Sequence, residues 1–524
     1  MSGKGGRRDW AESVVGSPIT ISDPIARPST LAGSASRWLR WEVPAAILAF
    51  ATAVRLLGLD KSLWLDEASS YLQATAPDFV AAARAYDHPP LYYALLRTGL
   101  HATRSFPILR LFSVGCGVGA VAVFCFFFGA RQRVAGWYAG LLLAASPAFV
   151  LNSQELRQYA LLSLEFALAL WFAWRLVQDS RNTRALIGLA SVLALAACTH
   201  LVTSFFVAAL GCVTLWQQRR EPLDRLGRVA LCFVPAALLL WFFKSRFLTQ
   251  TVMDPALWWM PPVDAELLRY VFNEITGWTS IMWVADASDG LLPGMATGVL
   301  AVSTLAAALV VWTAWGHRSA SSAHALLAMA LLYCGLVITY ALAVVPIVWP
   351  RIMLPGMLPF MLGLGLGVAT NPRARQRAAA GAAAVLLAMT MMVPWVSGLA
   401  WEPLEPLRAV SDALRRNSKP ADLLVLIDGA DWALEPYWPE YKERRRVLKV
   451  GLAEPVEQTL AALRAARARR PPGSAFVLLY RSDLFSEPRQ DVLDEIMSSI
   501  SSGGMPVEKR WEKSAYHIVR FRGP

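Results

Sequence analysis

Charged residues are scarce in this chain, and their scarcity excludes an ordinary soluble protein. Asp, Glu, Lys and Arg make up 17% of the sequence, whereas soluble domains carry about 25%. The apolar residues, 56% of the chain, are gathered in long runs. The 50 basic residues exceed the 38 acidic ones, but they fall in short clusters between the apolar runs, which is typical of membrane orientation signals. The composition therefore predicts a polytopic α-helical membrane protein that binds membrane lipids and no nucleic acid.

Cysteine is also sparse, and its placement excludes a disulfide framework or a CxxC metal site. All six cysteines lie inside apolar runs, where we expect them to act as small hydrophobic side chains between packed helices. They are Cys116, Cys125, Cys198, Cys212, Cys232 and Cys334.

Residues 1–40 have no apolar periodicity and are rich in Gly, Ser, Pro and Arg. This composition predicts a disordered tail. The tail is too long for the charged region of a cleaved signal peptide, and no convincing cleavage site follows the first apolar run. Its arginines favour a cytoplasmic N-terminus.

An apolar run that crosses a bilayer needs about 20 residues. Segment 89–106 fits either a short span or a helix lying on the membrane. Only the second choice leaves the Arg131/Arg133 and Arg181/Arg184 loops in the cytoplasm. The clear spans fall near residues 41–59, 108–130, 134–152, 158–178, 229–247, 290–315, 323–347, 351–370 and 378–400.

Segment 185–216 is too long for one upright span, because about 32 residues at 1.5 Å each reach about 48 Å. Arginines flank both ends, which favours a hairpin of two short helices turning near Thr199–His200; one long tilted helix is the alternative. With the hairpin, the count is about eleven spans in a membrane domain over 41–401, and the C-terminus lies outside.

Residues 402–524 differ in character, because charge rises and long apolar runs stop. Short β-like runs alternate with helical stretches near 405–416, 455–468 and 488–500, which predicts a small extracytoplasmic α/β domain. The three β-like runs are Leu423–Ile427, Ala475–Tyr480 and Ala515–Val519.

Ionisable residues from distant segments converge on the predicted outer face. Many lie in the first outer loop, about residues 60–107, and the others lie at the outer ends of spans. Carboxylates beside Arg and His suit a reaction that removes a proton and stabilises an anionic leaving group. The group consists of Arg55, Asp66, Glu67, Asp87, His88, Arg110, Glu155, Arg157, Tyr159, His200 and Arg351.

Simpler roles compete with this interpretation, such as helix capping, interfacial anchoring and snorkelling of arginines to lipid phosphates. A divalent cation such as Mg²⁺ or Mn²⁺ is possible, because Asp66, Glu67 and Glu155 could share one. No ligand periodicity requires it.

The order of these motifs resembles the GT-C superfamily of lipid-dependent membrane glycosyltransferases, especially the branch of protein O-mannosyltransferases and bacterial lipid A aminoarabinose transferases. The resemblance covers about residues 41–400. Its motifs are Arg55, Leu63–Ala68, Asp87–Tyr93, Leu109–Leu111, Ser153–Tyr159, Thr199–His200 and Arg351–Pro355, with Ile352 in place of the family's aromatic residue.

The resemblance implies an inverting transfer of a sugar from a polyprenyl-phosphate donor to an acceptor hydroxyl on the outer face. Asp66 would be the catalytic carboxylate, and Arg55, Glu67 and His88 would shape its site. Arg110 and Arg351 would contact the donor phosphate, since guanidinium groups suit phosphate oxygens. A lysine that some members use near the phosphate has no obvious counterpart.

A lipid or sugar transporter is the main alternative, and a receptor-like scaffold is the third. A transporter predicts charges at the membrane midplane and two related halves, and the sequence has neither. The acceptor could be a lipid, a glycan or a protein. High Ala and Arg usage suggests a bacterial plasma membrane.

Overall fold

The computed structural model describes twelve segments of the chain and a few single positions beyond residue 460. The segments are 35–85, 88–129, 132–251, 263–276, 293–315, 321–392, 407–427, 434–443, 447–450, 474–480, 507–513 and 516–522. Most of the predicted N-terminal tail, Asp87 and the predicted helices at 455–468 and 488–500 therefore fall wholly or mostly outside the described residues. The helix α1 begins at Ala35, before the end of the predicted tail.

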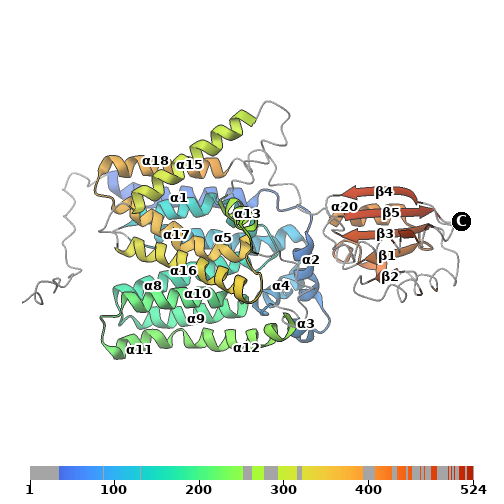
Figure 1. The fold of residues 1–524 in the computed structure, drawn as a ribbon, viewed down its shortest axis with the longest axis horizontal. Coiled ribbons are helices and arrows are strands. Elements are labelled where there is room, and N and C mark those ends of the chain that lie inside the picture. Colours follow the sequence, from blue (N-terminus) through green and yellow to red (C-terminus); the bar gives the residue numbers. More distant parts are fainter. Residues whose placement is uncertain are drawn as a thin grey trace, which may run out of the picture. The chain divides into compact units, whose positions relative to one another are not determined.

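A helical bundle occupies the larger part of the chain (Figure 1). Within it, α5 packs against α6 and α8, and α17 packs against α16, α6 and α15. The helices are α1 Ala35–Leu56, α2 Leu65–Thr75, α3 Phe79–Ala85, α4 Leu91–Ala102, α5 Phe106–Phe126, α6 Arg133–Ala145, α7 Pro147–Ser153, α8 Tyr159–Gln178, α9 Thr183–Thr199, α10 Thr203–Gln217, α11 Leu223–Leu231, α12 Val234–Thr251, α13 Ala265–Thr276, α15 Pro293–Trp315, α16 Ser321–Ala343, α17 Pro350–Thr370 and α18 Ala374–Met391.

The bundle is that of an integral membrane protein, as the composition predicts. Within the described segments, five helices are long and apolar enough to cross a bilayer, or six if the bent pair α6 and α7 is one span. The five are Phe106–Phe126, Tyr159–Gln178, Leu223–Phe243, Ser322–Ala343 and Pro350–Thr370. The count of about eleven spans stays a prediction.

The long apolar segment 185–216 forms two helices, α9 and α10. The break falls at His200–Val202, where the N–H of His200 still bonds to the carbonyl of Ala196 and the N–H of Thr203 bonds to that of His200. The prediction of two short helices turning near Thr199–His200 is therefore confirmed, and the alternative of one long helix is wrong. Segment 89–106 contains the 12-residue helix α4, which is too short to cross a bilayer upright.

A bend of 67° separates α6 from α7 and is caused by Pro147. Because proline has no N–H, the carbonyl of Leu143 lacks its usual helical donor. The buried Arg55 of α1 donates to this carbonyl at 3.4 Å and to that of Ala144 at 3.1 Å. Backbone groups inside a membrane protein need such internal partners. The bend carries the chain into the polar turn 154–158, which precedes α8.

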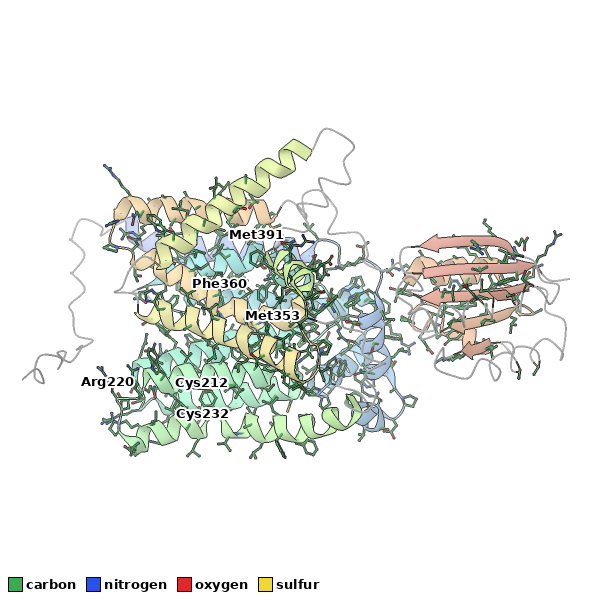
Figure 2. All side chains as sticks on the ribbon, viewed as in Figure 1. Cys212, Arg220, Cys232, Met353, Phe360 and Met391 are labelled. Carbon is green, nitrogen blue, oxygen red and sulfur yellow. The ribbon has the colours of Figure 1, made fainter. Side chains whose placement is uncertain are left out.

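The bundle has two chemically different ends. Helices α2, α3 and α4 gather at one end (Figure 1), and Arg220 lies at the opposite end (Figure 2).

Figure 2 also labels Cys212 and Cys232 among the helices. All six cysteines are free, and three of them are buried.

The C-terminal part forms a five-stranded sheet with the helix α20 Leu407–Asn417, so the predicted α/β fold is confirmed. The strand order is β2-β1-β3-β5-β4. The pairs β1–β2 and β1–β3 are parallel, and β3–β5 and β4–β5 are antiparallel. The strands are β1 Leu423–Ile427, β2 Val447–Val450, β3 Ser474–Tyr480, β4 Val507–Lys513 and β5 Tyr516–Arg522. The three predicted runs correspond to β1, β3 and β5.

Candidate active site

Asp66 lies in the first turn of α2, at the end of the bundle that carries α3 and α4. The helix begins directly after Trp64, whose backbone N–H donates to Glu67 Oε2 at 3.3 Å. This contact caps the helix from its third residue, as in a capping box. The side chain of Asp66 keeps 35% of its surface exposed, so it is accessible to a second molecule.

Glu67 differs from its neighbour because it is fully buried and fully paired. Its Oε2 lies 2.7 Å from Arg110 Nη2, and its Oε1 accepts from Arg110 Nε at 2.9 Å. The backbone N–H of Leu156 donates to Oε1 at 2.7 Å. A buried carboxylate needs such compensation, because burial alone strongly disfavours the charge. Glu67 therefore joins α2, α5 and the 154–158 turn.

Arg110 uses all its donors inside the protein. Besides its two bonds to Glu67, Nη1 donates to the carbonyls of Leu59 and Lys61, both at 2.7 Å, and Nη2 to that of Ser62 at 3.3 Å. A guanidinium has five N–H groups, so none is left for a phosphate. Arg110 was predicted to contact the donor phosphate. In the structure its guanidinium instead holds the loop before Asp66.

Arg351 makes the central contact of the site. Its Nη1 donates to Asp66 Oδ2 at 2.8 Å, although the two residues are 285 positions apart. The guanidinium carbon also lies 4.0 Å from the ring centre of Trp64. An aromatic face stabilises a cation beside it, and here it keeps the planar guanidinium group of Arg351 in one orientation. The side chain of Arg351 remains 18% exposed.

Arg157 is the second arginine at Asp66. Its Nη1 donates to the backbone carbonyl of Asp66 and to Ser70 Oγ, both at 3.1 Å, and its Nη2 lies 3.6 Å from Asp66 Oδ2. It therefore fixes both the backbone and the carboxylate of Asp66. Asp66 thus faces two cations from different elements.

Glu155 lies on the other side of Arg351, with Oε1 3.9 Å from Nη2. Burial raises the pKa of its carboxyl group, and Arg351 opposes that shift. Its Oε2 has no hydrogen-bond partner among the described residues. A buried carboxylate oxygen without a partner is costly, and this marks Glu155 as a group available to a bound molecule.

Two histidines from distant segments meet beside this cluster. The rings of His88 and His200 are 4.9 Å apart, and Tyr159 lies 5.5 Å from His200. Burial, with a further effect of Arg157, lowers the pKa of His88 to about 3, and burial lowers that of His200 well below its ordinary value. Both imidazoles are therefore neutral at physiological pH. His200 Nδ1 accepts from the N–H of Val202 at 3.0 Å, which assigns its proton to Nε2.

Lys61 joins the site although no sequence motif singled it out. Burial lowers the pKa of its ammonium group, and Glu155 and Glu67 oppose the shift. The sequence carried no pattern at Lys61 beyond its position five residues before Asp66, in the loop that precedes α2. Arg55, in contrast, binds the α6–α7 bend and Ser153. Asp87 lies outside the described residues.

Among the described residues, Asp66, Glu67 and Glu155 are not grouped as ligands of one metal ion, and the divalent cation stays a prediction. Glu67 is saturated by Arg110 and Leu156, and Asp66 and Glu155 both face Arg351. The described residues contain no group of three His, Cys, Asp or Glu side chains that could hold a metal ion.

The comparison with known families supports the motif evidence. Residues 87–246 match the sequence model of the dolichyl-phosphate-mannose-protein mannosyltransferase family. Over this segment the match supports the protein O-mannosyltransferase branch of the predicted resemblance. The matched segment includes His88, Arg110, the 154–158 turn and His200, but neither Asp66 nor Arg351. No curated protein sequence matches the chain.

Three solved structures match the chain at low identity. The chain is 15% identical to ArnT from Cupriavidus metallidurans in the apo state, covering 93% of this chain and 98% of that one, with a TM-score of 0.44. The oligosaccharyltransferase of Archaeoglobus fulgidus is 12% identical, the match covers 85% of this chain and 70% of that one, and the TM-score is 0.43. The Pmt1–Pmt2 complex of S. cerevisiae bound to the sugar donor is 19% identical, the match covers 41% of this chain and 33% of that one, and the TM-score is 0.32. At these TM-scores, the roles of the site residues must be argued from this chain's own contacts.

Proposed function

We propose that this protein is an inverting glycosyltransferase that moves a sugar from a polyprenyl-phosphate donor to an acceptor hydroxyl. The observation that carries the proposal is the Asp66–Arg351 pair, with 2.8 Å between Oδ2 and Nη1. It joins an accessible carboxylate to a partly exposed guanidinium at one end of a membrane-embedded bundle. The family match over residues 87–246 supports the same reaction class.

Asp66 acts as the general base in this reaction. Its carboxylate takes the proton from the acceptor hydroxyl while the oxygen forms a bond to the anomeric carbon of the sugar. The bond from that carbon to the phosphate oxygen breaks, and its electron pair leaves with the lipid phosphate. One displacement inverts the anomeric centre. The base must lie within hydrogen-bond reach of the hydroxyl, and the exposure of Asp66 permits this.

Arg351 stabilises the departing phosphate, because its guanidinium group is partly exposed and lies over the ring of Trp64. A planar guanidinium matches two phosphate oxygens. Arg157 holds Asp66 in place through its backbone and carboxylate. The saturated Glu67–Arg110 pair anchors the loop beneath them. This division of roles replaces the symmetric use of Arg110 and Arg351 expected from the sequence.

A lipid-linked donor is supported by the location of the site. A sugar on a lipid phosphate can be presented at the membrane interface, whereas a nucleotide sugar is highly charged and does not cross a bilayer. We assign the protein to the bacterial plasma membrane, with a cytoplasmic N-terminus and an extracytoplasmic C-terminal domain. The separation of Arg220 from α2–α4 supports this orientation (Figures 1 and 2), because basic loops favour the cytoplasm.

The test is sugar transfer by purified protein in nanodiscs, from a panel of polyprenyl-phosphate sugars to lipid, glycan and peptide acceptors. Release of polyprenyl phosphate, measured by mass spectrometry, should depend on Asp66. Donor binding is assayed separately with the Asp66→Asn variant. Bound donor with no transfer in the wild type for any acceptor in the panel would refute the proposed reaction.

A further inference from the structure

The segment Gly58–Trp64, here called the approach loop, leads directly into the helix that carries Asp66. It has no regular secondary structure between α1 and α2 apart from a turn. On its bundle side it is held by Arg110, through the carbonyls of Leu59, Lys61 and Ser62. The position of Asp66 therefore depends on how completely this loop is fixed.

A second set of contacts on the approach loop comes from the C-terminal domain. The backbone N–H of Leu63 donates to the hydroxyl of Tyr437 at 2.7 Å. Arg408 of α20 donates through its backbone N–H to Ser62 Oγ at 3.0 Å, and through Nη2 to the carbonyl of Asp60 at 3.2 Å. The loop is thus bound by both parts of the chain.

Apolar packing supports these hydrogen bonds. Leu63 is fully buried and belongs to one hydrophobic cluster with Leu407, Val410 and Leu414 of α20. The ring of Tyr437 packs edge-on against Phe106, the first residue of α5, with centroids 5.6 Å apart. Arg408 lies 5.5 Å from the centre of the Tyr437 ring. Because Leu63 is buried, its N–H has no access to solvent if Tyr437 is lost.

We propose that Tyr437 is a positioning residue for Asp66, and that the C-terminal domain serves as one half of a clamp on the approach loop. Leu63 lies three residues before Asp66, and Arg110 holds the carbonyls immediately before it. Arg110 can only donate hydrogen bonds to the carbonyls of the approach loop. The Tyr437 hydroxyl can accept one from a backbone N–H of the loop. The inference rests on the proposed function for its catalytic consequence, but the clamp itself is a structural claim.

The test compares Tyr437→Phe with Tyr441→Phe. The first variant removes the bond to Leu63 and keeps the ring on Phe106. The second removes a buried hydroxyl that bonds to Glu435 Oε1 at 3.0 Å within the same domain. Arg408→Ala is a third variant, at an exposed position, and it removes the bond to the carbonyl of Asp60.

Hydrogen–deuterium exchange gives a readout that needs no activity. Peptides covering residues 57–66 should exchange faster in Tyr437→Phe and Arg408→Ala than in the wild type and in Tyr441→Phe. Unchanged exchange in Tyr437→Phe would overturn the clamp. Faster exchange in Tyr437→Phe, together with no sugar transfer by the wild type, would instead refute the proposed function and leave the clamp standing.

Sugar transfer then tests the positioning role. Tyr437→Phe should lower kcat about threefold to tenfold, the scale of one lost hydrogen bond, with the donor KM within about twofold. In the Asp66→Asn background the same substitution should have no further effect, because residues that act through one group are not additive. An equal loss in both backgrounds, or faster exchange with wild-type turnover, would overturn the role.

Discussion

Arg351 Nη1 lies 2.8 Å from Asp66 Oδ2, although 285 residues separate them in the chain. This contact joins the first turn of α2 to the first turn of α17. It pairs a group that can accept a proton with one that can stabilise a phosphate. Because both side chains remain partly exposed, the pair can act on a bound molecule rather than serve only the fold.

Replacing Asp66 with Asn should remove transfer and spare donor binding. The amide keeps the shape of the carboxylate but cannot take a proton, so kcat should fall by about 10²–10⁴. Asp60→Asn is the matched control, since Asp60 is an exposed carboxylate in the loop that precedes α2, and it should retain wild-type turnover. Rates are measured with purified variants in nanodiscs. Near wild-type turnover of Asp66→Asn would refute the role of base and favour a transporter.

The arginines of the site should respond differently to substitution by Ala. Arg351→Ala should fold and lose about 10²–10³ in turnover, the scale of a removed charge stabiliser. Arg110→Ala should instead reduce the yield of folded protein, because it leaves Glu67 as an uncompensated buried charge, which costs about 3–5 kcal/mol. Arg104→Ala, at an exposed position, is the control. Size-exclusion profiles and transfer rates separate the outcomes, and a folded, inactive Arg110→Ala would return Arg110 to the phosphate site.

Gly117 of α5 should be required for the packing of Arg55 and Ser153. A Cβ at this position would collide with Ser153 Oγ and come within 3.0 Å of Arg55 Nε. Gly117→Ala should therefore destabilise the protein by about 1–3 kcal/mol. Gly115→Ala is the matched control in the same helix, since a Cβ there meets nothing within 4 Å. Thermal unfolding in detergent is the measurement, and equal melting temperatures would contradict the prediction.

Acid should destabilise the protein through the histidine pair His88 and His200. The pKa values of His88 and His200 are lowered in the folded state, whereas an unfolded histidine has a pKa of about 6.5. Below that value the unfolded state binds more protons, so stability falls with decreasing pH and is fully present above about pH 6.5. The melting temperature should drop between pH 7.5 and 5.5.

The slope of that pH dependence identifies the groups. It should flatten in a double variant with His88→Gln and His200→Asn, because neither new amide titrates and the one at position 200 can still accept from the N–H of Val202. His101→Asn, at an exposed position on α4, should leave the slope unchanged. An unaltered slope in the double variant would show that other groups cause the acid sensitivity.

Cysteine labelling should test the orientation in intact cells. A cysteine replacing the exposed Thr98 of α4 should react with a membrane-impermeant thiol reagent, and one replacing the exposed Ala374 should not. The signal of the unmodified protein is the baseline. The reverse pattern would place α4 and the site on the cytoplasmic side and refute extracytoplasmic transfer.

The sequence by itself determined the class of protein, the positions of most helices and the identity of the polar residues. Long apolar runs can only be buried in a bilayer or a large core, so the helices follow from local composition. The break at His200 followed from segment length and from arginines at both ends. The runs at β1 and β3 were readable because these buried strands are almost continuously apolar, and β5 was readable from its Tyr, Ile and Val residues. Strands β2 and β4 were not, since they lie at the sheet edges and carry charged residues.

Only the tertiary structure decided what each charged residue contacts. From the sequence, Arg110 and Arg351 were equivalent phosphate ligands, and Asp66 and Glu67 were neighbouring carboxylates whose surroundings were unknown. The fold buries Glu67 and Arg110 as an ion pair and leaves the side chains of Asp66 and Arg351 partly exposed. Lys61 and Tyr437 carried no visible pattern, because their importance arises from contacts with the approach loop and its neighbours. Burial and partner geometry depend on packing between distant segments, and no local pattern encodes them.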